Sequence, residues 1–262
     1  MRPPVYFISQ VPAHLDRALY IPRHGDGVTH FALYDISKEY FEEVGMHPMG
    51  SESYKIELYV LRKPSGYHVG DNARFLVNLD ASGTSMSIQE RCIGREAVEA
   101  EVSLPTKQAK GFSIRSKTSA ASVEINGELS YPLPDKHTKK AHIRYPYLTV
   151  FTKSTSDQVG PVHLQWQVHP LQDGPLRYEL VDLQRRSRGH DSESSILAIY
   201  HHLGFESELP TSYSHGALLV PSNSTSAFEV KIVSSLIGVL SSVRQQSAFE
   251  KKSRIKSLIP GL

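Results

Sequence analysis

Histidines are the first residues whose number suggests chemistry, because the chain holds 13 of them. His163 and His169 lie in one predicted strand and are about 20 Å apart at the rise of a strand, which is too far for one metal ion. His201 and His202 are adjacent, so in a strand their side chains point to opposite faces. The sequence contains no His-Glu-x-x-His motif. We therefore expect no metal site, and assign the histidines to surface positions and hydrogen-bond networks.

Nucleophilic catalysis has little support in the sequence. A Ser-His-Asp triad depends on geometry that a sequence does not show, and no Gly-x-Ser-x-Gly motif is present. The segment 189–192 (GHDS) reads as a polar loop, and the single cysteine, Cys92, as a buried thiol. The sequence contains no Gly-x-Gly-x-x-Gly and no Gly-Lys-Ser loop, so it gives no indication of nucleotide binding. We predict that the protein is not an enzyme and has no cofactor.

Two basic clusters are the better functional lead. Guanidinium forks and lysine ammonium groups both suit phosphate oxygens. The alternative is that the clusters are solvated loops that aid solubility. The candidate ligands for lipid headgroups are Arg185, Arg186 and Arg188 in the first cluster, and Lys139, Lys140 and Arg144 in the second cluster.

The overall composition is that of a globular protein. Of 262 residues, 29 are Lys or Arg and 27 are Asp or Glu, so the net charge of +2 lacks the basic excess of a nucleic-acid-binding domain. A hydrophobic fraction of 39% is sufficient for a core at this length. One cysteine excludes an intrachain disulfide and fits a reducing compartment, so we expect a cytoplasmic protein.

The elements that must position these residues are mainly strands. Apolar and polar residues alternate in segments such as 54–60, 74–79, 98–104 and 162–168, as in antiparallel sheets with one buried face. Turn signals separate the segments, and Asn126-Gly127 is the strongest hairpin signal. The segment 37–54 reads as a loop with one helical turn that stops at Gly45. The alternation predicts about a dozen strands before residue 220.

A different periodicity marks the end of the chain. Ser226 and Glu229 have capping-box spacing, and apolar residues then recur every three or four positions and predict a helix over about 226–246. The opposite face carries serines and Gly238 instead of charges, so the helix should be surrounded by protein. Residues 248–262 form a basic tail in which we expect little order.

Membrane insertion is not expected. The N-terminus lacks the apolar stretch of a signal peptide. The longest strongly apolar uncharged segment, 232–243, is shorter than the roughly 20 residues of a membrane span.

The last quarter of the chain resembles the tubby C-terminal domain and its relatives, the plant LURP-one-related proteins and the phospholipid scramblases. The segments that carry the resemblance are 195–204 (SILAIYHHLG), 213–221 (YSHGALLVP) and the helix that follows. They are most similar to fungal tubby-like proteins, and upstream only the strand pattern matches. The resemblance implies a twelve-stranded barrel threaded by a hydrophobic helix. The phosphoinositide-binding residues of tubby proteins find no match here, so no site residue is implied.

These observations predict an all-β protein. We expect an antiparallel barrel of about twelve strands with a buried hydrophobic helix near the C-terminus, in a single domain over 1–247. The function expected from the resemblance is a non-enzymatic module, peripheral to membranes, that binds phosphoinositide or anionic phospholipid through basic loops. Two alternatives remain open: a small-molecule enzyme or binder with a pocket at the barrel mouth, and an interaction scaffold without a ligand.

The only tryptophan tests the assignment of the two strand faces. Trp166 shares the apolar face of its strand with Val162, Leu164 and Val168, so we expect it to be buried with its indole N–H hydrogen-bonded. Its fluorescence should be blue-shifted in the folded protein and should move to the red on unfolding. Native emission like that of free tryptophan would show that the other face of the strand is buried.

Overall fold

The structure is a computed structural model. It describes residues 11–25, 27–48, 51–61, 73–80, 84–91, 99–103, 111–117, 122–130, 147–152, 162–169, 177–187, 193–203 and 213–258. Cys92 and the segment 189–192 lie outside these ranges.

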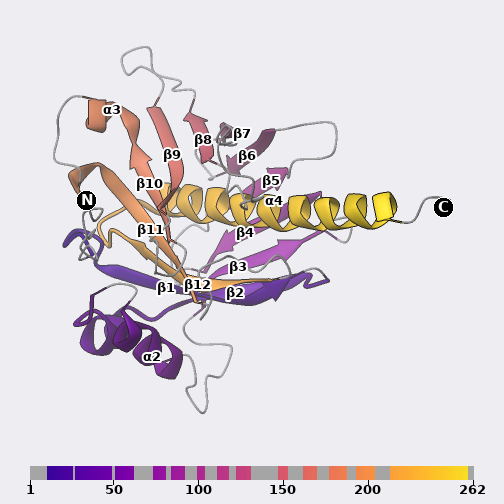
Figure 1. Ribbon diagram of the computed structural model, residues 1–262. Coiled ribbons are helices and arrows are strands. Elements are labelled where there is room, and N and C mark those ends of the chain that lie inside the picture. The colour runs from indigo at the N-terminus through magenta and orange to yellow at the C-terminus, as the bar shows by residue number, and fades with distance from the viewer. Residues whose placement is uncertain are drawn as a thin grey trace, which may run out of the picture.

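Antiparallel strands make up most of the described residues (Figure 1). Each strand pairs with its neighbours in the chain, and β1 pairs with both β2 and β12, in the order β1-β12-β11-β10-β9-β8-β7-β6-β5-β4-β3-β2. The strands are Arg17–Gly25 (β1), His30–Asp35 (β2), Ala73–Leu79 (β3), Ser85–Glu90 (β4), Glu99–Ser103 (β5), Gly111–Lys117 (β6), Ser122–Ser130 (β7), Tyr147–Thr152 (β8), Val162–His169 (β9), Arg177–Asp182 (β10), Ile196–His202 (β11) and Tyr213–Val220 (β12).

Short helical elements join some of the strands, and a long helix follows the last one. The helices are Ser37–Glu39 (α1), Glu52–Leu61 (α2), Leu183–Ser187 (α3) and Ser226–Leu258 (α4), with a π-helical turn at Tyr40–Val44 (η1) and a 3₁₀ turn at Glu193–Ser195 (η2). The prediction of an antiparallel sheet followed by one apolar helix is confirmed. The helical turn that stops at Gly45 is also confirmed.

Two local predictions were wrong. The segment 54–60 forms helix α2 instead of a strand, because Tyr54 and Leu58, one helical turn apart, are buried while Ile56 between them is 55% exposed. Asn126 and Gly127 lie inside β7 instead of forming a hairpin turn. The register that pairs Ile114 with Ile125 continues through both residues and places the β6–β7 connection between Lys117 and Ser122.

Helix α4 lies along the middle of the sheet, with strands on both sides of it (Figure 1). Its N-cap is Thr225, whose hydroxyl accepts a hydrogen bond from the backbone N–H of Phe228 at 3.3 Å. The predicted capping box at Ser226 is therefore wrong by one residue. The helix continues to Leu258, beyond the predicted end near 246.

Every described position of α4 from 232 to 244 is buried. The segment Ser226–Arg244 is long and apolar enough to cross a membrane by length and composition, but 78% of its most apolar window is buried inside the protein. The prediction that Leu236, Ile237 and Ser235 are buried is confirmed.

The main core lies between α4 and the face of the sheet that surrounds it. Alternate residues of the strands, such as Phe75, Val77 and Leu164, pack there against the helix. Trp166 is fully buried in this core, and its indole nitrogen donates a hydrogen bond of 2.9 Å to the Ser235 hydroxyl, as predicted for this side chain.

A second core lies on the outer face of β1, β11 and β12, beneath α1, η1 and α2. Tyr40 and Tyr54 are fully buried there, and their hydroxyl groups lie 2.9 Å apart. The sequence pattern did not predict this outer core, because the residues that form it were assigned to a loop and a strand.

The two adjacent serines of α4 provide a matched test of its packing. Ser235 Oγ accepts the Trp166 hydrogen bond, whereas Ser234 Oγ is buried without a hydrogen-bond partner in the described part of the chain. Ser235→Ala should lower the free energy of unfolding by about 1–3 kcal/mol, because it leaves the indole N–H unsatisfied. Ser234→Ala should be neutral or stabilising. Urea unfolding followed by tryptophan fluorescence measures both, and equal effects of the two substitutions would contradict this role of Ser235.

Candidate functional site

The end of the sheet at which α4 begins brings together charged residues from distant parts of the chain. Strand β12 ends there at Val220, which pairs with Arg17 at the start of β1. The antiparallel registers place the end of β2, the start of β3, the end of β4 and the end of β10 at the same end. We call it the helix-start end.

Two of the predicted site residues lie at the helix-start end. Arg185 and Arg186 are exposed on α3, which follows β10 directly. The Arg185 guanidinium lies 3.5 Å from the Asp182 carboxylate, and Arg186 donates a hydrogen bond of 3.1 Å to the Gln167 side chain. The other predicted cations, Arg188, Lys139, Lys140 and Arg144, lie outside the described residues.

The strands that flank the second basic cluster in the sequence meet at the end of the sheet opposite to α3. Strands β7 and β8 flank the second cluster, and they end and begin at the paired residues Ser130 and Tyr147. Because β8 is antiparallel to β9, and β9 to β10, this pair lies at the end opposite to α3.

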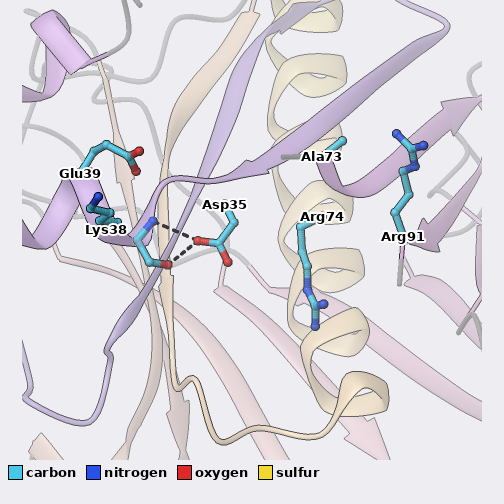
Figure 2. Close-up of a pocket in the computed structure, with 7 residues that line it drawn as sticks. Asp35, Lys38, Glu39, Ala73, Arg74 and Arg91 are labelled. Carbon is cyan, nitrogen blue, oxygen red and sulfur yellow. Dashed lines mark hydrogen bonds between the residues drawn. The ribbon is translucent and has the colours of Figure 1, made fainter. Parts of the chain in front are cut away.

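An open pocket of about 430 Å³ also lies at the helix-start end (Figure 2). Residues of α1 line one part of it, and residues at the start of β3 and the residue after β4 line another. The backbone N–H of Arg91 donates a hydrogen bond of 2.8 Å to the carbonyl of Arg74, which joins the two arginines of the pocket. The lining residues are Asp35, Ser37, Lys38, Glu39, Ala73, Arg74 and Arg91.

A buried carboxylate from the first turn of α4 holds the inner side of this region. Glu229 Oε2 lies 2.9 Å from Arg17 Nη1 and 3.1 Å from Arg74 Nη2, and Arg74 Nη2 also lies 2.6 Å from Glu90 Oε1. Both carboxylates are fully buried. A buried carboxylate near a helix N-terminus is favoured by the helix dipole and by cationic partners. This cluster therefore fixes α4 against β1, β3 and β4.

Sequence reasoning missed this group of residues. Glu229 was assigned to a capping box, and Arg17, Arg74 and Glu90 belong to no motif. The spacing of the two arginines in the sequence gives no sign that they meet one carboxylate. Only the strand registers bring them together.

Buried histidines and tyrosines lie toward the opposite end of the sheet. His202 Nδ1 lies 3.2 Å from the Tyr200 hydroxyl, which donates a hydrogen bond of 3.0 Å to the His215 carbonyl. His24 stacks on Phe31 at 4.1 Å, and its Nε2 lies 3.3 Å from Arg244 Nη1. Arg244 also donates hydrogen bonds to the hydroxyl groups of two serines, Ser214 and Ser241.

These surroundings keep His24 and His202 neutral. Burial, followed by the positive charge of Arg244, lowers the pKa of His24 to about 3. Burial, followed by His215, lowers the pKa of His202 to about 3. Burial raises the pKa of Tyr40 to about 12.

The described residues contain no group of three or more His, Cys, Asp or Glu side chains that could hold a metal ion. His201 and His202 face opposite sides of β11, as predicted. The His201 ring contacts that of Tyr54 in the outer core at 4.9 Å, and His202 lies beside Tyr200 in the inner core.

His24 and His202 predict a loss of stability in acid. Their folded-state pKa values lie near 3, below the ordinary value of 6.5. The unfolded chain therefore binds more protons as pH falls, so their contribution is complete above about pH 6.5 and is lost between about pH 6.5 and 3. The free energy of unfolding should fall by up to about 2.7 kcal/mol per pH unit in this window.

Urea unfolding across this pH range measures the slope. His202→Gln should roughly halve it, because only one of the two histidines is then left to titrate. His30→Gln, at an exposed position, serves as the control. A slope that is the same in His202→Gln and in the unmodified protein would contradict the assignment to His202.

Known proteins add no further identification. No family model, no curated protein and no solved structure matches this chain.

Proposed function

We propose that this chain is a non-enzymatic, tubby-like module, built as a closed twelve-stranded barrel around α4, that docks on anionic phospholipid membranes. It would do so in the cytoplasm as a peripheral protein, with the helix-start end facing the lipid. The strand order, in which β1 pairs with both β2 and β12, supports the barrel. A helix buried on every side also supports it.

The observation that carries the lipid proposal is the gathering of exposed cations at one end of the sheet. Lys38, Arg91, Arg185 and Arg186 are exposed there and come from three separate parts of the chain. The arginine and lysine side chains suit phosphate oxygens. Arg17 and Arg74 pair with the buried carboxylates Glu229 and Glu90, so these ion pairs belong to the framework and not to the docking surface.

Electrostatic attraction of this kind is weak for each residue and useful in sum. A Lys or Arg near an anionic lipid surface contributes about 1 kcal/mol, and the attraction decays within a Debye length. Four such cations would give about 4 kcal/mol, roughly three orders of magnitude in affinity. Asp35, Glu39 and Asp182 at the same end reduce this sum.

A second candidate function is the binding of a small molecule, and the pocket between α1 and the β3–β4 pair favours it. Its volume of about 430 Å³ lies in the range of small-molecule sites, and charged side chains make up most of its lining. An interaction scaffold without a ligand stays a third possibility that no single feature of the structure favours.

Flotation with phosphatidylcholine vesicles, with and without phosphoinositide, tests the lipid proposal. We expect binding to the anionic vesicles only, and a steep loss of binding as salt rises to physiological strength. Arg185→Gln with Arg186→Gln should weaken binding by about tenfold or more, because two exposed cations are lost. The control is Arg23→Gln, which removes an exposed arginine of β1 that lies away from the helix-start end. Protein that stays unbound to phosphoinositide vesicles at low salt would exclude the lipid proposal.

A further inference from the structure

A serine lies among the arginines of the helix-start end. Ser187 is the last residue of α3 and is exposed. Arg185 and Arg186 precede it directly, and Arg188 follows it in the sequence. The hydroxyl of Ser187 donates a hydrogen bond of 2.9 Å to the carbonyl of Gln184 in the same turn. An accessible hydroxyl in a run of cations is a candidate acceptor for a phosphoryl group.

Helix α3 fixes the place of this serine on the sheet. Asp182, the last residue of β10, accepts hydrogen bonds of 2.9 and 3.1 Å from two backbone N–H groups of the first turn of α3. Arg186 donates a hydrogen bond of 3.1 Å to Gln167 of β9, which ties the helix to the neighbouring strand. Within the described ranges, the hydroxyl of Ser187 bonds only inside its own turn. A group added to this oxygen would therefore break no contact with the sheet.

The charges around Ser187 are mainly positive. The three arginines carry three positive charges, and the Asp182 carboxylate, 3.5 Å from the Arg185 guanidinium, removes one of them. A phosphoserine carries about −1.5 to −2 charges near pH 7. Phosphorylation would therefore bring the group close to neutrality. The phosphate oxygens would also accept hydrogen bonds from guanidinium groups that lipid phosphates would otherwise use.

The residues on each side of Ser187 indicate the class of kinase. Kinase specificity depends in part on the charges that flank the acceptor residue. Two arginines before the serine and one after it suit a substrate groove lined with carboxylates. Ser194 is also exposed, but it follows Glu193 and lacks this pattern. A helix of a single turn gains little from its own hydrogen bonds, so opening α3 to present Ser187 costs little.

We propose that Ser187 is a phosphorylation site for an arginine-directed serine kinase, and that phosphate on it releases the protein from anionic lipid. In the modification step, Ser187 Oγ forms a bond to the γ-phosphorus of a nucleoside triphosphate, and the bond from that phosphorus to the diphosphate oxygen breaks. The nucleoside diphosphate leaves, and the hydroxyl proton passes to a base of the kinase. The release rests on the lipid docking proposed above, whereas the modification does not.

Incubation of the full chain with an arginine-directed serine kinase and ATP tests the modification. Mass spectrometry should locate phosphate at Ser187 and not at Ser194. Ser187→Ala should remove the corresponding phosphopeptide. Absence of phosphate at Ser187, under conditions in which a peptide substrate of the same kinase is fully modified, would overturn the site.

Flotation with phosphoinositide vesicles at low salt tests the release. Protein with phosphoserine installed at position 187 by genetic code expansion should bind about ten- to thirtyfold more weakly than the unmodified protein, because about two positive charges near the lipid are neutralised. Ser187→Ala should bind as the unmodified protein does. Equal binding of the phosphorylated and unmodified proteins would overturn the release.

Ser253 offers a matched control, because the same charge pattern surrounds it. Lys251 and Lys252 precede it and Arg254 follows it. It belongs to the last turns of α4, which lie on the opposite side of the sheet from α3 (Figure 1). Phosphoserine installed at position 253 adds the same charge but should leave docking unchanged, because the attraction decays within a Debye length. Equal weakening by both phosphates would show an effect of net charge alone and would overturn the release assigned to Ser187.

The lipid proposal and the phosphorylation proposal fail in different ways. Unmodified protein that does not float with phosphoinositide vesicles contradicts docking and release together, while mass spectrometry still decides whether Ser187 is modified. Unmodified protein that floats, with phosphorylated protein that floats equally well, contradicts the release alone.

Discussion

The burial of the segment 232–244 of α4 on all sides is the constraint on which the rest of the structure depends. No described position from 232 to 244 faces solvent, so apolar side chains must reach the helix from every direction. The strands supply them from alternate positions, and the small residues Ser234 and Ser235 are buried among them. The few polar groups in this core need partners, and the hydrogen bond from Trp166 to Ser235 meets that need.

The start of the helix imposes a second requirement that gives the molecule its charged end. Glu229 is fully buried, and a buried carboxylate is tolerated only with cationic or hydrogen-bonding partners. Arg17 and Arg74 provide them from β1 and β3. Arg74 also lines the open pocket, so one side chain belongs to both the framework and the candidate site. The same cluster therefore fixes the helix and positions a pocket cation.

The outer helical segment has a structural role of its own. It covers the outer face of β1, β11 and β12, where Tyr40, Tyr54 and His201 lie buried. It also carries Lys38 and Glu39 into the pocket. A change in the packing of this outer core would therefore move one wall of the candidate site while leaving the inner core in place.

The sequence by itself determined the period-2 strands, the apolar helix at the end of the chain and the burial of Trp166, because each depends on local periodicity and on the removal of apolar surface from water. It also located the exposed arginines of α3. It did not determine that 54–60 is helical, since Tyr54 and Leu58 fit both periods and only their packing on the outer core distinguishes them. Nor could it bring Lys38, Arg74 and Arg91 together, or assign Glu229 to Arg17 and Arg74. Those contacts follow from strand register and from the position of α4, which are properties of the tertiary structure alone.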